Sequence, residues 1–582
     1  MANIDLVERP VKELERETYL YNPENPLILQ SDQTALLEVD HPRYVPARDA
    51  LARFAELEKS PEHIHTYRIT PLSLWNAAAA GFTAQAILGQ LESFAKYDLP
   101  GNVVRDITDY IGRYGRVKLV RDGYRLLLVS EDPALIAEIV RHKKMQSYLE
   151  MQLDPLRLQV NPAMRGHIKQ ALVQIGYPAE DLAGYVEGDA LALELLDITR
   201  KGKPFNMRHY QNDAADLFYA NGAASGGSGT IVLPCGAGKT IVGMAVMEKL
   251  QTSTLILTPN TVAARQWMDE LHDKTTLGLD QIGEYSGLTK EICPVTISTY
   301  QIMTYRKRGA ENEFPHFELF NARNWGLIIY DEVHLLPAPV FRITSELQAR
   351  RRLGLTATLV REDGREEDVF SLIGPKKYDV PWRDLERQGW IATAQCHEVR
   401  IPLPEDLRME YAMAEQREKY SVAAHNPSKI DVMLALLRKH RQDNILVIGL
   451  YINQLEEIAN LLQAPLITGK TPVREREKLY NKFRSGEVTV LVVSKVANFA
   501  IDLPDANVAI EISGTFGSRQ EEAQRMGRIL RPKQDGAIAH FYTLVTRDTI
   551  DQTFAANRQR YLTEQGYGYE ILYDTDVLQK GR

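Results

Sequence analysis

The chain has 582 residues, of which 44% are hydrophobic and 25% are charged. At roughly 100 to 200 residues per domain this length predicts about three to five folded domains, and the composition excludes a collagen-like or disordered protein. The 69 Lys and Arg residues against 77 Asp and Glu residues give a net charge of −8. That balance excludes a protein that coats nucleic acid by overall charge alone, but it leaves room for a local basic groove.

The three cysteines, Cys235, Cys293 and Cys396, lie far apart and form no CxxC pair. Neither a disulfide framework nor a zinc site built from thiols is therefore expected. The charged beginning of the chain has no signal-peptide core, and no run approaches the roughly 18 apolar residues of a membrane span. We expect a cytoplasmic, monomeric protein with no membrane partner.

Two small α/β units are expected in the first part of the chain. Residues 1–25 form an acidic lead-in. In residues 26–148 the strand-like runs LILQ and TALLEV precede a helical period in PARDALARFAELEK, and GRVKLVRDGYRLLLVS predicts a hairpin that turns at Asp122-Gly123. In residues 149–203 the alternating run LRLQV precedes a helical period in HIKQALVQIG and a closing strand-like ALELLDI.

From residue 204 onward short β-branched runs alternate with amphipathic helices, which is typical of parallel α/β layers. The strand runs are IVLP, TLILTP, VTISTY, GLIIYDE and RLGLTAT before residue 360, and ILVIGL, LITG, TVLVVS, NVAIEIS and AIAHFYTL after residue 440. We predict two tandem parallel α/β domains, residues 204–380 and 381–582, preceded by the two smaller α/β units.

The run IVLPCGAGKT predicts a strand, a loop of small residues and the start of a helix, which is a phosphate-binding arrangement. Lys239 would reach the β and γ phosphates of a nucleotide, and Thr240 would hold Mg²⁺. The strict pattern has Gly where this chain has Leu233, and a tight structural turn is the alternative. The candidate nucleotide-binding residues of this run are Leu233, Pro234, Cys235, Gly236, Ala237, Gly238, Lys239 and Thr240.

Two adjacent acids, Asp331 and Glu332, end the apolar run GLIIYDEVH. Mg²⁺ bound to ATP takes one carboxylate, which suits Asp331, and the other acid suits polarising the attacking water. Such a pair is commonly a solvated loop, but it follows the phosphate-binding run at a plausible distance.

The run QEEAQRMGRILRP predicts a helix on which Gln524, Arg528 and Arg531 share one face. An arginine inserted across a domain cleft can stabilise charge on a transferring phosphoryl group. A surface with salt bridges is the alternative for this segment alone. Together with the two preceding motifs, it indicates the opposite wall of a nucleotide cleft.

With these motifs the sequence resembles the superfamily 2 helicases, and its DEVH box resembles that of the XPB family of DNA repair helicases. RHYQNDA, with Gln211, looks like the adenine-contacting Q motif, and LTAT looks like motif III. TPNTVAARQW and STYQIM look like DNA-contacting segments, SKVANFAIDLP looks like motif V, and a further run matches the RED motif associated with strand separation. The corresponding DNA-contacting or unwinding candidates are Arg265, Thr299, Arg361, Glu362, Asp363, Ser494 and Lys495.

The resemblance covers nearly the whole chain and implies two RecA-like motor domains that use ATP and Mg²⁺. Residues 26–148 resemble the family's N-terminal domain, 149–203 occupy the place of its damage-recognition domain, and 405–428 could supply a short thumb-like segment. By this resemblance the protein would move 3′ to 5′ on single-stranded and forked duplex DNA, in nucleotide excision repair.

Other functions remain open alternatives at this stage. The motor of a restriction or other nuclease complex shares these motifs, although no separate nuclease signature is evident and a partner nuclease stays an open question. An RNA helicase is less favoured, because DEVH together with RED points elsewhere. A DNA-binding scaffold with a weak or inactive motor would predict loss of Lys239, Glu332 or Arg528, and all three are present.

Overall fold

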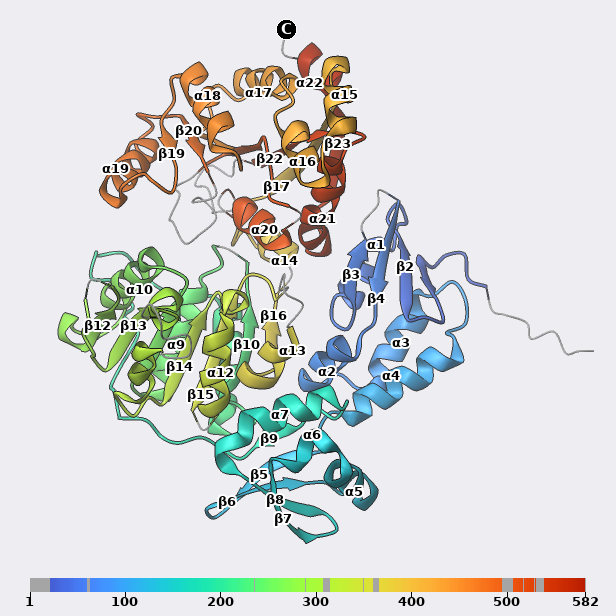
Figure 1. Cartoon of the computed structure of the whole chain (residues 1–582), viewed down its shortest axis with the longest axis vertical. Helices are drawn as coiled ribbons and strands as arrows, with labels where there is room; N and C mark the ends of the chain where they lie inside the picture. Colours follow the sequence, from blue (N-terminus) through green and yellow to red (C-terminus); the bar gives the residue numbers. More distant parts are fainter. Residues whose placement is uncertain are drawn as a thin grey trace, which may run out of the picture.

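Within the part of the chain that the structure describes, the fold is organised by four β-sheets (Figure 1). The computed structural model describes residues 21–59, 63–223, 225–234, 236–287, 289–306, 314–348, 350–359, 366–380, 382–494, 506–516, 518–527, 529 and 538–580. Among the described residues, none of the helices combines the length and the apolar character needed to span a bilayer.

The first small domain has an antiparallel sheet in the order β1-β2-β4-β3. LILQ and TALLEV form strands as predicted, but the expected helix of PARDALARFAELEK ends at Leu51 and strand β3 follows. The change occurs because Leu57 is buried between the exposed Glu56 and the half-buried Glu58, which is the period-two pattern of a strand. The elements are β1 (Leu27–Leu29), β2 (Thr34–Glu38), β3 (Glu56–Lys59), β4 (Ile64–Arg68), α1 (Tyr44–Leu51), α2 (Pro71–Ala79), α3 (Ala84–Phe94) and α4 (Gly101–Arg113).

The second small domain has a five-stranded sheet in the order β7-β8-β6-β5-β9. Its β5-β6 hairpin turns through Gly123, whose φ is +58°. Leu126 on β6 pairs with Val160 on β8, so the sheet runs across the boundary expected between residues 148 and 149. The elements are β5 (Lys118–Asp122), β6 (Arg125–Val129), β7 (Leu149–Asp154), β8 (Arg157–Val160), β9 (Glu180–Leu182), α5 (Pro133–Arg141), α6 (Lys143–Gln146) and α7 (Arg165–Gln174).

The segment ALELLDI, expected as a closing strand, is instead an extended connection along the next domain. Ala190 forms an isolated bridge with Thr252, and Leu195 forms one with Thr275. Leu191 N–H also donates to the Gln251 carbonyl at 3.0 Å. The backbone groups of this connection are therefore satisfied by the first large domain rather than by the sheet that precedes it.

The first large domain has a fully parallel seven-stranded sheet in the order β12-β13-β11-β14-β15-β10-β16. The five predicted strand runs are confirmed, and the two edge strands, which are short and carry polar residues, were not predicted. The strands are β10 (Ser228–Val232), β11 (Thr254–Thr258), β12 (Ile282–Tyr285), β13 (Val295–Thr299), β14 (Leu327–Asp331), β15 (Arg351–Thr356) and β16 (Lys376–Asp379). The helices are α8 (His209–Tyr219), α9 (Lys239–Leu250), α10 (Thr261–Lys274), α11 (Tyr300–Met303), α12 (Ala338–Glu346) and α13 (Glu366–Asp368).

The second large domain repeats this architecture in the order β19-β20-β18-β21-β22-β17-β23. Its five predicted runs are also confirmed. The strands are β17 (Ala394–Ile401), β18 (Ile445–Ile448), β19 (Leu466–Ile467), β20 (Val490–Val493), β21 (Val508–Glu511), β22 (Ala539–Thr546) and β23 (Tyr569–Tyr573). The helices are α14 (Trp382–Arg387), α15 (Glu405–Met413), α16 (Gln416–Ala424), α17 (Ser428–Lys439), α18 (Ile452–Leu462), α19 (Val473–Arg484), α20 (Arg519–Gly527), α21 (Ile550–Glu564) and α22 (Asp574–Lys580).

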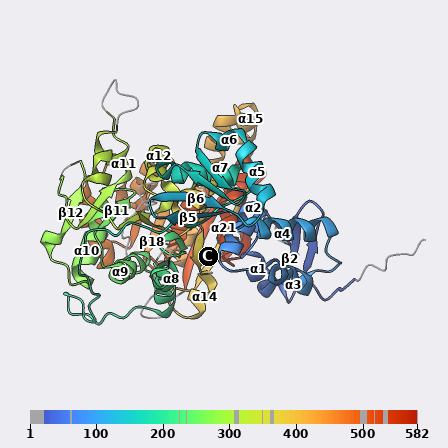
Figure 2. The ribbon, with the colours of Figure 1, turned by 90° about the horizontal axis from the view of Figure 1, so that it is seen from below.

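The two small domains contact the large ones through hydrogen bonds and aromatic packing, among other contacts. Figures 1 and 2 show the first small domain, in blue, at the side of the large domains, with the second small domain below the first large one in Figure 1. Leu57 N–H donates to Glu564 of the second large domain at 3.4 Å. Trp75 packs against Phe370 of the first large domain with ring centroids 6.4 Å apart. Gln170 of the second small domain donates to Asp368 at 2.8 Å.

Candidate nucleotide site

The loop between β10 and α9 is built for a close approach of backbone to a ligand. Gly236 and Gly238 have φ of +82° and +83°, and α9 begins directly after Gly238. A Cβ on Gly238 would lie 2.4 Å from Gln211 Nε2, so this position requires glycine. The N–H groups of the first turn and the positive dipole end of the twelve-residue helix α9 favour a bound phosphate at this loop.

The loop is fixed from behind by α8. Gln211 Nε2 donates to the Ala237 carbonyl at 2.9 Å, and the Tyr210 hydroxyl donates to the same carbonyl at 2.8 Å. Gln211 Oε1 accepts from Arg208 N–H at 2.9 Å, and the Arg208 guanidinium lies 4.7 Å from the centre of the Trp390 ring. Gln211 therefore braces the loop in this structure, and its contact with adenine stays a prediction.

The substituted position Leu233 belongs to the core rather than to the loop. Its side chain is fully buried, and its N–H donates to the Thr356 carbonyl at 3.0 Å. Ala237 is also buried. A side chain at position 233 is accommodated because it points into the apolar interior while the following residues form the loop.

Asp331 and Glu332 lie at the carboxyl end of β14, beside the start of α9. Lys239 Nζ lies 3.2 Å from Glu332 Oε1, so the structure brings together two of the predicted catalytic residues. Asp331 accepts from Trp267 Nε1 at 2.9 Å and from Glu332 N–H at 3.0 Å. Burial, followed by the charge of Glu332, raises the pKa of Asp331 to about 6, although Lys239 opposes the shift.

These donors fit a hard cation such as Mg²⁺. Asp331 and Glu332 concentrate two carboxylates in a largely buried place, and the ammonium of Lys239 offsets part of that charge. Thr240 adds a hydroxyl in the first turn of α9. Oxygen donors of this kind are those that Mg²⁺ prefers, with phosphate and water oxygens completing its shell.

A short polar chain links the acids to β15. His334 Nδ1 lies 2.7 Å from Thr356 Oγ1 and 3.5 Å from Glu332 Oε2. Thr356 Oγ1 in turn donates to the Thr358 carbonyl. A change in the charge around Glu332 can therefore be transmitted to the run LTAT through one imidazole ring.

The predicted DNA-contacting residues lie in different surroundings. Arg265 exposes about half of its side chain on α10 and lies 4.0 Å from Glu284. Thr299 is buried, and its hydroxyl accepts from Ile302 N–H at 3.3 Å at the start of α11. Ser494 is buried as well. Cys235, Arg361, Glu362, Asp363, Lys495, Arg528 and Arg531 lie outside the described residues.

Helix α20 carries Gln524, whose side chain also lies outside the description. The neighbouring Arg525 is fully buried and donates to Glu511 at 2.5 Å. Sequence reasoning assigned no role to Glu511. The signal that could have revealed it is a carboxylate within NVAIEIS, an otherwise apolar buried strand run, because a buried charge requires a partner.

Comparison with known proteins agrees with this architecture. The family model "ERCC3/RAD25/XPB C-terminal helicase" matches residues 385–581. "Type III restriction enzyme, res subunit" matches residues 204–361, and "Helicase conserved C-terminal domain" matches residues 27–154.

Relatives match the chain over nearly its full length. A protein of Kineococcus radiotolerans named DNA 3′-5′ helicase XPB is 56% identical over 95% of this chain and 97% of its own length. One of Mycobacterium tuberculosis with the same name is 56% identical over 95% and 99%. The XPB helicase/translocase subunit of general transcription and DNA repair factor IIH from Enterocytozoon bieneusi is 33% identical over 94% and 92%. The two large domains are therefore tandem RecA-like domains, and the chain belongs to the XPB family of helicases.

Proposed function

We propose that this protein is an ATP-dependent DNA helicase or translocase that moves 3′ to 5′ and opens duplex DNA during nucleotide excision repair. The observation that carries the proposal is the contact of Lys239 with Glu332, beside Asp331, at the phosphate-binding loop. The names of the bacterial relatives support DNA as the substrate and 3′ to 5′ as the direction. That the protein acts as a monomer in the cytoplasm stays a prediction.

The residues of the first large domain would act in sequence on the nucleotide. An incoming triphosphate draws Lys239 away from Glu332, because the phosphates carry more negative charge than one carboxylate. The freed carboxylate of Glu332 can then orient a water and accept its proton. Thr240 and Asp331 would hold Mg²⁺, which supplies positive charge at the phosphate oxygens.

The second large domain would complete the site with Gln524, Arg528 and Arg531. Arginine groups placed on the transferring phosphoryl group accelerate such reactions by about 10³ to 10⁵. Closing of the two domains around ATP and their opening after hydrolysis would then move the protein along a strand. Arg265, Thr299, Ser494 and Lys495 are the proposed contacts to that strand, and a small opening at the buried Thr299 and Ser494 would be needed to expose them.

ATP turnover without polymer and with single-stranded DNA, duplex DNA or RNA tests the proposal directly. Lys239→Ala should abolish the DNA-stimulated turnover. Lys249→Ala is the matched control, because Lys249 lies on the same helix and forms a surface ion pair with Asp216 at 2.6 Å. Wild-type turnover in Lys239→Ala, or stimulation by RNA alone, would contradict the proposal.

Displacement of a labelled strand from substrates with 3′ or 5′ tails tests the direction and the role of the RED run. Replacement of Arg361, Glu362 and Asp363 by alanine should impair strand displacement more than ATP hydrolysis. An equal loss of both activities would remove the strand-separating role.

The motor of a nuclease complex is the second candidate. The observation that favours it is the match of residues 204–361 to the restriction-enzyme subunit model. That match covers the first large domain alone, whereas the XPB relatives cover all four domains. Purification with a nuclease that requires this chain for cleavage would favour this second function.

A further inference from the structure

Helix α20, which the proposed function places against the nucleotide, is held from behind by an ion cluster of Glu511, Glu522, Arg525 and Arg558. All four side chains are fully buried. Arg525 donates to Glu511 at 2.5 Å, and Arg558 lies 3.1 Å from Glu511 and 3.5 Å from Glu522. Because buried charges without partners are costly, these contacts fix α20 relative to β21 and α21.

The turn of residues 512–516, between β21 and the approach to α20, has very little freedom. A Cβ on Gly514 would lie 2.2 Å from both the Arg558 guanidinium carbon and a Glu511 carboxylate oxygen. Arg558 Nη1 donates to the Thr515 carbonyl at 3.2 Å. The Ser513 hydroxyl accepts from Leu450 N–H at 3.0 Å. A shift of this turn would therefore disturb the ion cluster and α20 together.

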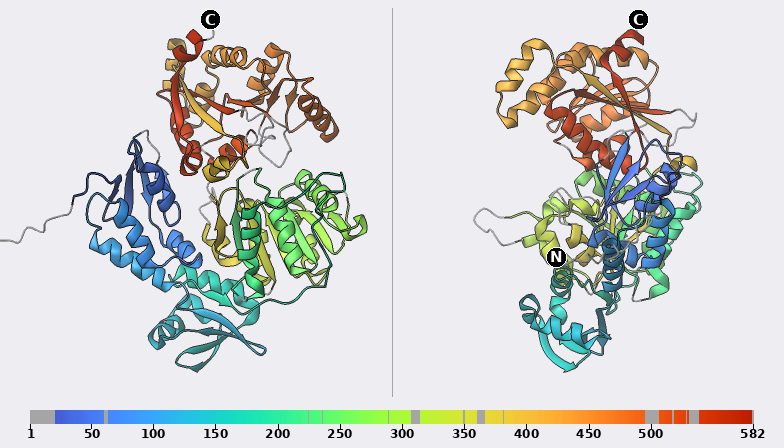
Figure 3. Two further views of the ribbon diagram at one scale, coloured as in Figure 1. Left: turned by 180° about the vertical axis from the view of Figure 1, so that it is seen from behind. Right: turned by 90° about the vertical axis from the view of Figure 1, so that its right-hand side faces the viewer.

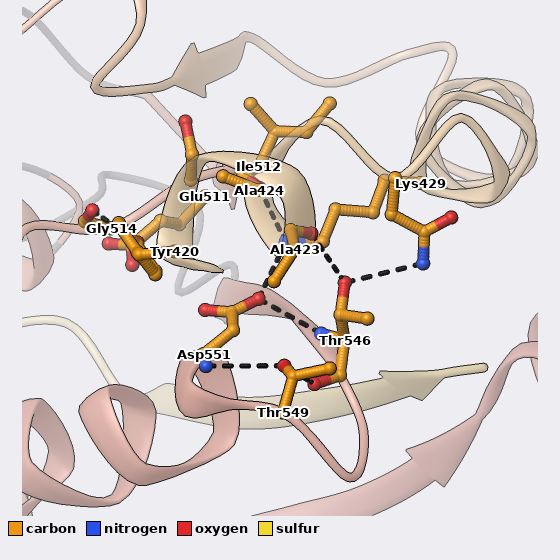
Figure 4. Close-up of polar contacts among 12 residues, drawn as sticks. Tyr420, Ala423, Ala424, Lys429, Glu511, Ile512, Gly514, Thr546, Thr549 and Asp551 are labelled. Carbon is orange, nitrogen blue, oxygen red and sulfur yellow. Dashed lines mark hydrogen bonds and ion pairs between the residues drawn. The ribbon is translucent and has the colours of Figure 1, made fainter. Parts of the chain in front are cut away.

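The segment 405–428 contacts this turn from the other side. The Tyr420 hydroxyl on α16 donates to the Gly514 carbonyl (Figure 4). On α17, directly after the segment, Lys429 Nζ donates to the Ile512 carbonyl at 3.0 Å and to Asp551 at 2.8 Å. Tyr420 and Lys429 are both buried. Tyr420 of the segment and the adjoining Lys429 thus bind two carbonyls of the same turn.

The outer surface of the segment does not favour DNA phosphates. Helix α15 has no buried residue, and Figure 3 shows the α15-α16 pair projecting from the second large domain. The two helices carry an excess of acids over bases, namely Glu405, Asp406, Glu410, Glu415 nearby and Glu418 against Arg408, Arg417 and Lys419. A groove that tracks a nucleic-acid backbone would need the opposite balance.

We propose that the segment 405–428 is a brace for the nucleotide-facing helix α20 rather than a grip on DNA, and that Tyr420 is its positioning residue. This inference rests on the proposed function, in which Gln524 on α20 and Arg528, which follows that helix in the sequence, act on the nucleotide. The hydroxyl of Tyr420 holds the 512–516 turn in place through the Gly514 carbonyl. This position of the turn lets α20 reach the phosphates when the large domains close.

Tyr420→Phe tests the brace, because it removes one hydroxyl and keeps the ring contacts with Phe516 and Phe554. The kcat of DNA-stimulated ATP hydrolysis should fall about fivefold to tenfold, the range expected for one lost buried hydrogen bond. The Kd for a fluorescent single-stranded oligonucleotide and the KM for ATP should not change.

Thr546→Val is the matched control for lost stability. Thr546 Oγ1 donates to the Ala423 carbonyl of α16 at 2.7 Å and accepts from Asn426 Nδ2 at 3.3 Å, so this variant removes two buried bonds at the same helix and its C-terminal end without touching the turn. It should lower the Tm at least as much as Tyr420→Phe does and keep the wild-type kcat. An equal loss of kcat in both variants, or no loss in Tyr420→Phe, overturns the brace.

Arg417→Ala with Lys419→Ala tests the grip. The brace predicts the wild-type oligonucleotide Kd and the wild-type dependence of that Kd on salt. Weaker binding with a salt slope reduced by about one per lost phosphate contact would establish the grip instead. Arg528→Ala separates the two proposals, because normal turnover in that variant contradicts the proposed function, whereas a loss there together with a normal Tyr420→Phe contradicts the brace alone.

Discussion

Replacement of Asp331 by asparagine should stabilise the fold while it ends ATP hydrolysis. Burial and the neighbouring Glu332 raise the pKa of Asp331 from 3.8 to about 6. Since one pKa unit corresponds to about 1.4 kcal/mol, ionised Asp331 destabilises the folded protein by about 3 kcal/mol. Asparagine still accepts from the Trp267 indole but no longer from Glu332 N–H, and that lost bond costs about 1 kcal/mol. The net stabilisation at neutral pH is therefore about 2 kcal/mol.

The dependence of this effect on pH gives a second, independent check. An acid whose pKa is raised by folding causes no destabilisation below its unfolded pKa, and the full destabilisation appears only above the folded pKa of about 6. The advantage of Asp331→Asn should thus be present at pH 7.5, shrink at pH 5 and vanish near pH 4.

Urea denaturation followed by tryptophan fluorescence at these three pH values measures the free energy of unfolding. Asp406→Asn is the control, because Asp406 is exposed on α15 and its replacement should change nothing. An Asp331→Asn variant that is no more stable than the wild type at pH 7.5, or equally stabilised at every pH, would refute the reasoning.

Three other substitutions have defined outcomes. Glu332→Gln should keep ATP binding but reduce hydrolysis at least a hundredfold, because a general base contributes about 10² to 10⁴; rapid single-turnover hydrolysis would contradict this. Gly238→Ala should weaken ATP binding at least tenfold by displacing Gln211, whereas Gly486→Ala, with a similar φ and no atom within 4 Å of its Cβ, should cost only about 1 kcal/mol of stability and leave ATP binding intact. Burial, and to a smaller extent the charges of His440 and His397, lower the pKa of His540 to about 4. The contribution of the neutral His540 to stability is therefore present above pH 6.5 and is lost as the pH falls toward 4. Over this range the Tm of His540→Asn should fall less than the Tm of the wild type.

The strands with continuous apolar runs could be predicted from the sequence, whereas the strands rich in polar residues could not. β10 and β11 are buried at every position, so their apolar runs stand out. β16, with the sequence KKYD, has no buried residue, and β17 mixes Gln, His, Glu and Arg with apolar residues. Such strands are specified by their neighbours in the sheet, which local sequence patterns do not reveal.

The site shows the same division between local and distant information. Lys239 and the acids at the end of β14 carry motifs whose chemistry is local, and the structure brings Lys239 and Glu332 within 3.2 Å. The ion cluster behind α20 joins residues 511, 522, 525 and 558. Arg525 could be mistaken for part of a surface helix face, because its buried partner Glu511 lies outside α20, on strand β21.

The extended connection after the second small domain also determines where the chain can be cut. Although it contains no helix or regular strand, its bridges at Ala190 and Leu195 tie it to the first large domain. Proteases need a flexible stretch of chain that can enter their active sites. This stretch should therefore resist proteolytic cleavage. The second small domain and the first large domain, which it joins, should move together when ATP is bound and hydrolysed.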